Sequence, residues 1–428
     1  MKTGRLLVVL LILLLPLSVS AQEKEPGSSK DESRLEKQER KIEELEKLLT
    51  ELTKKIEKAE QEDEMKKLLE EADKLSREKK DESEAPEDRK FYSGLRQHSA
   101  LNPNISVGGN FYYAHSSSDS EYNMQPSETD YGTDRFYLKE IELAIEAVLD
   151  PYSRAKAFIG IGEEGAGVEE GYFELLNMPL NTNLKLGKFK TQFGESNRYH
   201  CHALPQFDRP RVMANFFGME TLKGVGIGAN ILLPSIIAHV NELDLQFVSG
   251  GSGLSFTDEG KNDYIGVAHL KNYWDLSRST YLELGLSGAL GHNDPEEKYL
   301  TTIGGADLRI KWTPPGRAKY REVLWWTEAL LSRRDTPDGY VDSWGIFSLV
   351  QYRFGARWVG GMRLDYSQMP DDSSAEEYGG TVNLDLWQSE FVFFRLQYSY
   401  FERNFDENDN RIVFQAVWAM GPHKHEAY

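Results

Sequence analysis

The short stretch Tyr199-His200-Cys201-His202 gathers side chains that could bind a metal or act as a nucleophile. In an extended segment His200 and His202 would share one face, so both imidazoles could reach the same transition-metal ion. No second group of ligands stands at a metal-binding spacing in the sequence. We therefore expect a loop that contains histidine, with no metal and no other cofactor.

Enzymatic chemistry finds little support elsewhere in the chain. Cys201 is the only cysteine, so it cannot form an internal disulfide, and no third residue is in evidence to orient a Cys/His pair for nucleophilic attack. The paired carboxylates Glu163-Glu164 and Glu169-Glu170 could suggest hydrolysis. A hydrolase would need a Ser/His or Asp/His set beside them, and we can assemble none. We expect no enzyme.

Composition and charge narrow the class of protein. The chain has 428 residues, of which 28% are charged, 39% hydrophobic and 11% aromatic. These values suit a soluble protein, and they equally suit a membrane β-barrel, in which only alternate residues of each strand meet lipid. The formal net charge of −19 makes nucleic acid an unsuitable partner.

Residues 1–21 have the pattern of a secretory signal peptide. Lys2 and Arg5 precede an apolar run over 6–15, and small residues end the segment at Val19-Ser20-Ala21. The apolar run is too short to span a bilayer as a helix, and no later stretch of about 18 residues avoids charge. The pattern predicts export from the cytoplasm.

Residues 22–90 are almost entirely Glu, Lys, Leu and polar residues. Apolar residues recur there with the three-four spacing of a heptad seam, interrupted near 61–64, at Leu35, Ile42, Leu45, Leu49, Leu52, Ile56, Ala59, Met65, Leu68, Ala72 and Leu75. This spacing predicts an α-helical coiled coil followed by a linker around Pro86. The alternatives are a lone charged helix or a disordered spacer.

From about residue 101 onward, apolar and polar residues alternate with period two. In the stretch 140–149, Ile141 and Leu143 fall on one face, whereas Glu140 and Glu142 fall on the other. The same alternation recurs to the end of the chain. It predicts sixteen strands, at 104–115, 135–149, 153–163, 168–177, 182–190, 220–233, 236–248, 263–275, 279–291, 301–313, 319–332, 341–354, 356–368, 376–388, 390–402 and 411–421.

The connections between the predicted strands alternate in length. Those after even-numbered strands are short, as at 150–152, 314–318 and 355, whereas most of those after odd-numbered strands are longer, as at 191–218 and 333–339. Tyr and Trp also recur near the strand ends. Unequal loops at the two ends and an even strand count predict a closed antiparallel barrel in the outer membrane of a Gram-negative-type bacterium, with its long loops outside.

Residues 91–428 resemble the phosphate-selective porin family of the O and P type. The likeness is carried by Leu186-Gly187-Lys188-Phe189-Lys190-Thr191-Gln192-Phe193-Gly194, by Phe414-Gln415-Ala416-Val417-Trp418, and by the terminal aromatic Tyr428. The resemblance implies a sixteen-stranded barrel that forms homotrimers. It also implies a pore lined by basic side chains and narrowed by folded-in loops, notably the third.

The third long loop, 191–218, would then form the constriction. Its candidate residues are Arg198, His200, His202, Arg209 and Arg211. Charged residues on polar strand faces would line the lumen, namely Arg309, Lys311, Arg357, Arg363, Arg395, Glu142, Asp365 and Asp385. Because acidic residues share these faces with basic ones, the ring of positive charge needed to select anions is present only locally.

Two functions follow as expectations. The first is a water-filled channel for passive diffusion of small solutes or ions; the resemblance implies anions such as phosphate. The second is a structural tether or binding protein, in which the barrel only anchors the coiled coil in the periplasm. There the coiled coil would reach peptidoglycan or a periplasmic partner.

Overall fold

The computed structural model describes residues 103–118, 134–162, 165–259 and 261–421. The predicted signal peptide (1–21) and coiled coil (22–90) lie outside these residues. The described residues belong to one compact unit, Gly94–Tyr428. In the part of the chain that the structure describes, no helix is long and apolar enough to cross a membrane.

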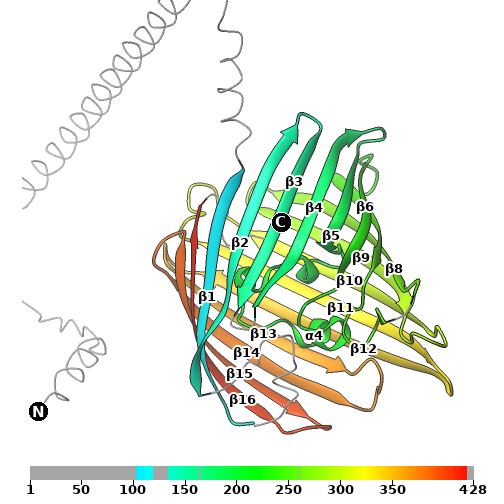
Figure 1. Cartoon of the computed structure of the whole chain (residues 1–428). Helices are drawn as coiled ribbons and strands as arrows, with labels where there is room; N and C mark the ends of the chain where they lie inside the picture. The colour runs from blue at the N-terminus through cyan, green and yellow to red at the C-terminus, as the bar shows by residue number, and fades with distance from the viewer. Residues whose placement is uncertain (1–102, 119–133, 163–164, 260, 422–428) are drawn as a thin grey trace, which may run out of the picture. The chain divides into compact units, whose positions relative to one another are not determined.

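Sixteen antiparallel strands form one closed barrel, as the period-two pattern predicted (Figure 1). The strands are β1 (Asn104–Ser116), β2 (Arg135–Asp150), β3 (Ser153–Gly162), β4 (Gly165–Met178), β5 (Thr182–Lys190), β6 (Lys223–Leu233), β7 (Val240–Ser249), β8 (Tyr264–Ser277), β9 (Thr280–His292), β10 (Leu300–Trp312), β11 (Glu322–Thr336), β12 (Gly339–Arg353), β13 (Trp358–Gln368), β14 (Glu376–Trp387), β15 (Val392–Arg403) and β16 (Asp409–Met420).

The ring closes where the first strand pairs with the last. Asn110 of β1 stands opposite Val417 of β16, in a ladder that runs from Val107 to Ser116. Each strand therefore has a hydrogen-bonded neighbour on both sides, and the wall has no free edge. Closure of this kind is what a β-sheet needs in lipid, where no water can satisfy an exposed edge.

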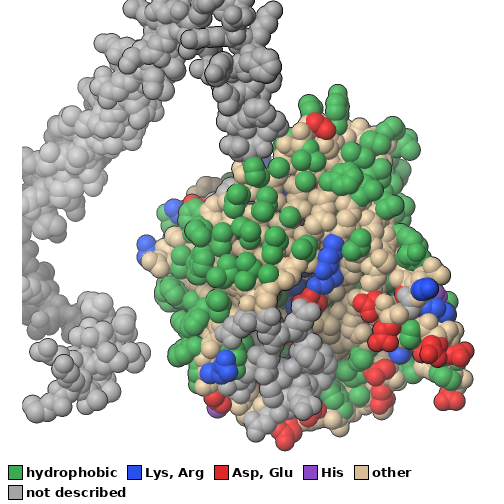
Figure 2. Space-filling view, in the orientation of Figure 1, with side chains coloured by type: hydrophobic (Ala, Val, Ile, Leu, Met, Phe, Trp, Pro, Cys, Tyr) green, Lys and Arg blue, Asp and Glu red, His purple; other side chains and the backbone are tan. Residues whose placement is uncertain are grey.

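The two faces of the wall differ as the alternation predicted. On β14, Val382 and Leu384 are 47% and 42% exposed on the outside, whereas Thr381 and Asp385 are 1% and 2% exposed on the inside. Figure 2 shows hydrophobic side chains gathered over the outer wall of the strands. An apolar band outside and a polar interior are the arrangement of a membrane barrel.

The connections confirm most of the predicted asymmetry, with three corrections, the first of which is the connection after β6, expected at 234–235 and found at 234–239. We call the end of the barrel that carries the predicted outer loops the long-loop end. Its connections include 191–222 and 250–263. At the opposite, short-turn end, 151–152 and 278–279 are tight turns. The expected long loop at 333–339 is instead a two-residue turn, because β11 and β12 continue pairing to Thr336↔Gly339. The expected short turn at 314–318 spans 313–321.

The outer wall generates a prediction about lipid. Leu286 lies at the middle of β9 and is 53% exposed on the outside, so Leu286→Arg would place a charge at the centre of the bilayer. We expect a loss of about 2–4 kcal/mol in the free energy of unfolding, measured by urea titration in lipid vesicles. Ile236→Arg, in the turn 234–239 at the short-turn end, is the control and should cost about 0–1 kcal/mol. Equal losses at the two positions would contradict the lipid-facing assignment.

Candidate functional site

The connection 191–222, here called the inner loop, folds back inside the barrel. It contains two short 3-10 turns, η4 (Ser196–Arg198) and η5 (Cys201–Ala203), and one helix, α4 (Arg211–Phe217), which lies within the ring of strands (Figure 1). α4 ends at Gly218, where φ is 76° and a side chain would be strained. The resemblance implied that this third long loop would be folded in.

The two ends of the inner loop are tied together. The Thr191 amide donates to the Leu222 carbonyl at 2.9 Å. The Asn197 side chain reinforces this neck. Its amide nitrogen donates to the Thr191 carbonyl at 2.9 Å and to the Leu222 carbonyl at 2.8 Å, and its oxygen accepts from the Leu222 amide at 2.8 Å. β5 and β6 therefore continue their ladder up to the base of the loop.

Aromatic packing anchors the inner loop to the wall. The ring of Phe193 lies 5.0 Å from that of Phe217, and the ring of Tyr199 lies 5.4 Å from that of Trp326 on β11. Phe216 and Val212 of the same cluster are fully buried. These contacts fill part of the lumen with a hydrophobic core, so the barrel is not an open tube across its whole width.

A first set of ion pairs fixes the inner loop to β13 and β14. Arg363 donates to Asp365 at 2.7 Å and to the Asp208 carbonyl at 2.9 Å. Arg211 donates its backbone amide to Asp365 at 2.9 Å, and its guanidinium lies 3.5 Å from Glu377. Burial would raise the pKa of Asp208, but Arg363 and Arg211 outweigh it and hold this pKa below its usual value.

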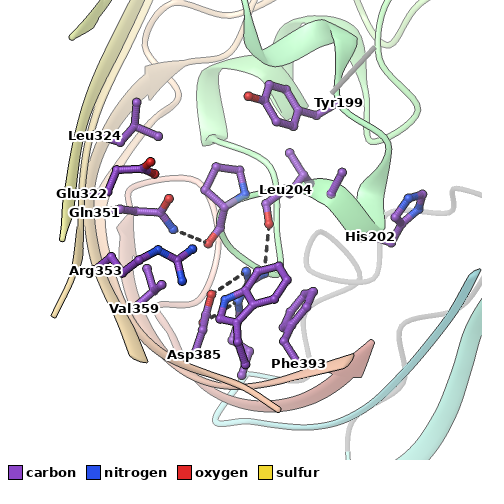
Figure 3. A pocket seen from close by; sticks show the side chains of 14 residues that line it. Tyr199, His202, Leu204, Glu322, Leu324, Gln351, Arg353, Val359, Asp385 and Phe393 are labelled. Atoms are coloured by element: carbon purple, nitrogen blue, oxygen red, sulfur yellow. Dashed lines mark hydrogen bonds and ion pairs between the residues drawn. The ribbon is translucent and has the colours of Figure 1, made fainter. Parts of the chain in front are cut away.

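A second set lies near the short-turn end. Arg395 makes a two-point contact with Asp385, with both N–O distances 2.9 Å, and donates to the Leu204 carbonyl at 3.1 Å. Gln351 donates to the Pro205 carbonyl at 3.0 Å. Figure 3 shows these groups around a cavity of about 160 Å³ between the inner loop and strands β11–β15.

Arg209 ties the inner loop to itself. Its guanidinium donates to the carbonyls of Tyr199 at 2.7 Å, Met219 at 2.9 Å and Ser196 at 3.2 Å. The residue is 4% exposed. Arg209 therefore acts as an internal staple that holds the turns η4 and η5 against the end of the loop.

Glu195 is the centre of a cationic cluster. Its carboxylate lies 2.8 Å from Arg309, 2.9 Å from Lys271 and 3.0 Å from Arg198. Burial would raise the pKa of Glu195, but the three positive charges outweigh burial and lower it to about 2. One carboxylate thus gathers three cations at one side of the inner loop.

His200 stands in a cage of glutamates. Its Nδ1 lies 2.8 Å from Glu142 and 3.0 Å from Glu169, and its Nε2 lies 3.0 Å from Glu170. Burial and Lys190 both lower the pKa of His200, but its hydrogen bonds to the three glutamates outweigh them and hold this pKa well above its usual value. His200 is fully buried.

The neighbours of His200 belong to the same cluster. The Cys201 thiol donates to Glu140, and burial together with this carboxylate raises the pKa of the thiol. His202 Nδ1 lies 3.6 Å from Glu142 and 3.8 Å from Glu140. The structure therefore supplies from β2 and β4 the second group of ligands that was not evident in the sequence.

Three adjoining cavities follow the wall beside the inner loop. The long-loop cavity, of about 730 Å³, is lined by Glu169, Lys188 and Lys223 among others. The middle cavity, of about 240 Å³, shares Lys190 with it. The short-turn cavity, of about 760 Å³, shares Arg198, Lys271 and Tyr273 with the middle cavity. Each cavity thus borders the next, from the long-loop end to the short-turn end.

The lining of these cavities reverses the charge balance of the chain. Twelve basic and ten acidic residues line the three cavities, whereas the whole chain has 50 basic and 69 acidic residues. Lys190 and Arg198 occupy the junctions between cavities. Basic residues therefore slightly outnumber acidic ones along these cavities.

The predicted site residues lie in three kinds of place: in a cavity, in the contacts of the inner loop, or in an exposed turn. Arg198, Arg309 and Lys311 line the short-turn cavity, on the inner side of the wall. The remaining inward residues are buried in the contacts given above, so most of them hold the inner loop and do not face an open pore. They are His200, His202, Arg209, Arg211, Arg363, Arg395, Glu142, Asp365 and Asp385. Arg209 still borders the long-loop cavity.

Arg357 corrects the prediction. It was expected on a polar strand face, but it lies exposed in the turn between β12 and β13, because β12 ends at Arg353 and β13 begins only at Trp358. Sequence reasoning missed Lys190 and Lys271, which line the cavities. Their placement on the inner face follows from the alternation of β5 and β8.

The Glu195 cluster predicts an acid-sensitive stability. The pKa of Glu195 is lower in the folded state than in the unfolded chain, so its stabilisation is fully present above about pH 4.5 and is lost as the pH falls towards 2. Glu195→Gln should remove about 3 kcal/mol of stability at neutral pH and flatten this part of the curve, measured by thermal unfolding in detergent. Glu220→Gln, at an exposed pair with Lys223, is the control and should leave the curve unchanged.

Comparisons with known proteins agree with the fold. No protein-family model matches the chain. An uncharacterized protein of Aquifex aeolicus (strain VF5) is 27% identical over 336 residues, which are 67% of this chain and 69% of that protein. OprB of Pseudomonas putida matches with a TM-score of 0.51 at 9% identity, covering 77% of this chain and 96% of OprB.

The outer membrane channel DcaP of Acinetobacter baumannii matches with a TM-score of 0.48 at 12% identity, covering 75% of this chain and 97% of DcaP. The likeness to OprB, at 9% identity, concerns the fold alone. The chain thus has the fold of a porin-like outer-membrane barrel, closed by sixteen antiparallel strands.

Proposed function

We propose that the protein is an outer-membrane channel for passive diffusion of small solutes or ions, with the inner loop as its constriction. The observation that carries the proposal is the series of three cavities that share lining residues from the long-loop end to the short-turn end. The apolar cluster fills part of the remaining lumen. Solutes would therefore pass along the wall formed by β2–β10.

The middle cavity has the smallest volume of the three cavities along the proposed route, about 240 Å³. Lys190 and Arg198 stand at its two junctions, and the Arg198 side chain is held in place by Glu195 at 3.0 Å. Fixed charges at a constriction set the sign of the ions that pass. We infer a weak preference for small anions, a class that includes phosphate.

The opposing carboxylates limit how strong this preference is. Lys271 lies 2.8 Å from Glu283 as well as 2.9 Å from Glu195, and Lys311 lies 3.0 Å from Glu322. Each such pair cancels part of the field that an anion would feel. The arrangement supports general anion preference better than a site dedicated to phosphate. The homotrimer and the periplasmic coiled coil remain predictions from the sequence.

Removing the inner loop tests the constriction. Because Thr191 and Leu222 are hydrogen-bonded to each other, residues 193–220 can be replaced by two glycines without separating β5 from β6. We expect a higher single-channel conductance in planar bilayers, since the deletion removes the loop and the side chains that the loop contributes to the apolar cluster. Heat-dependent migration on gels confirms that the variant is a folded barrel. An unchanged or lower conductance in a folded variant would refute the constriction.

Neutralising Arg198 tests the selectivity. A unit charge about 4 Å from an ion in water changes the energy of that ion by about 1 kcal/mol, which is about fivefold in local concentration. Arg198→Gln should therefore shift the reversal potential in a salt gradient towards cation preference, by up to about fivefold in permeability ratio. The control is Arg333→Gln, because Arg333 is exposed and paired with Asp342 away from the cavities. Equal shifts in both variants would contradict the assigned route.

The filled lumen favours a second function. Phe193, Phe216 and Phe217 pack against the wall as a plug would, so the barrel could serve only to anchor the N-terminal segment. Planar-bilayer recording of the intact protein distinguishes the two. Steady conductance supports the channel, whereas an anchor with a plugged lumen would not conduct.

A further inference from the structure

The glutamate cage around His200 is assembled from three separate parts of the chain. Glu142 comes from β2, Glu169 and Glu170 come from β4, and His200 comes from the inner loop just before η5. One imidazole nitrogen and one carboxylate oxygen from each of Glu142 and Glu169 all lie within 4.8 Å of one another. The proposed permeation does not use the contacts within this constellation, although Glu169 borders the long-loop cavity and Glu170 borders the middle cavity.

A β-bulge brings two consecutive glutamates to the same imidazole. In a regular strand, neighbouring side chains point to opposite faces. The pairing of β3 with β4 passes from Phe158↔Glu170 to Ile159↔Val168, so Glu169 is the extra residue of a bulge. Gly160 leaves space for it, since a Cβ at Gly160 would lie 2.7 Å from a Glu169 carboxylate oxygen.

We propose that Glu142, Glu169 and His200 bind one divalent first-row transition-metal ion inside the barrel. Imidazole nitrogen and carboxylate oxygen are common ligands of such ions. The two carboxylates approach the same ring nitrogen, Nδ1, at 2.8 and 3.0 Å. A cation placed among the three atoms would replace these short contacts by three metal–ligand bonds.

The separations between ligand atoms indicate the coordination geometry. With bonds of about 2.1 Å, separations of 2.8 and 3.0 Å correspond to angles of about 85–90° at the ion. A tetrahedral ion would keep its ligands about 3.4 Å apart. Both separations are therefore compatible with adjacent ligand positions on an octahedral ion, whose other positions would be open to water or to further ligands.

Glu170 is placed to orient the imidazole. It lies 3.0 Å from Nε2, the nitrogen that does not face the proposed ion. Histidines that bind metals usually donate their second N–H to a carboxylate, which fixes the tautomer and aims the free lone pair at the ion. Glu170 is thus a positioning residue. This hydrogen bond between a carboxylate and the second imidazole nitrogen distinguishes the site from a cluster of acidic residues alone.

Charge and access also suit a cation. Glu140, Glu142, Glu169 and Glu170 bring four carboxylates to this region, and Lys190 lies 3.8 Å from Glu169. Buried carboxylates are costly unless positive charge compensates them. Glu140, Glu169 and Cys201 line the long-loop cavity, which gives an ion an entry route.

The competing interpretation is a protonated imidazole held by carboxylates, with no ion. Cobalt(II) distinguishes the two, because its visible absorption reports both binding and geometry. We expect the purified full-length protein in detergent, after chelator treatment and dialysis, to bind one Co²⁺ per chain with the weak absorption of an octahedral ion. A wild-type protein that binds no Co²⁺ would overturn the proposal, whatever its conductance.

Substitutions assign the ligands. His200→Gln and Glu142→Gln should abolish the Co²⁺ spectrum, and Glu170→Gln should weaken Co²⁺ binding about tenfold to a hundredfold. His292→Gln is the matched control, since His292 also lies against a carboxylate, 3.3 Å from Asp263, at the long-loop end. Binding that survives His200→Gln, or that His292→Gln abolishes equally, refutes this site. If His200→Gln fails to fold, the partly exposed Glu169→Gln gives the same test at the cavity wall.

Discussion

Every backbone amide in a wall that faces lipid must find its hydrogen-bond partner within that wall, and most of this structure follows from the requirement. It forces β1 to pair with β16. Lipid on one side of this closed wall and a polar interior on the other then require the side chains of each strand to alternate. A closed ring of sixteen strands then encloses a wide polar space. Because charged side chains buried in that space need partners, the inner loop and the wall must satisfy each other.

The inner loop meets this need in two ways. Phe193, Phe216 and Phe217 give it an apolar face that packs on Trp326 and its neighbours. The rest of the loop presents carbonyls and carboxylates to inward arginines, so that each cation has a defined acceptor. The three cavities lie along the β2–β10 wall. There the residual space is lined by more basic than acidic residues, in a chain whose net charge is −19.

The period-two pattern predicted the barrel well because lipid outside and water inside leave a strict signature on each strand. The structure confirms all sixteen predicted strands and the predicted inward direction of Arg309, Lys311 and Glu142. The pattern failed where it meets a turn: Arg357 lies outside β13, and β11 and β12 pair beyond the expected ends. Partners of inward residues were not predictable, because the contact of His200 with Glu142 depends on the path of a loop across the lumen, and that with Glu169 depends on a bulge.

The hydrogen-bonded neck at Thr191 and Leu222 separates the inner loop from the barrel wall, so the two parts could evolve separately. Closure of the barrel requires only that β5 and β6 pair, and the residues between these strands do not change their hydrogen-bond register. Recombination at these two positions could therefore exchange the entire insert while the wall keeps its register. Exchange of this insert would let related barrels change which solutes cross the membrane while keeping the same lipid-facing wall.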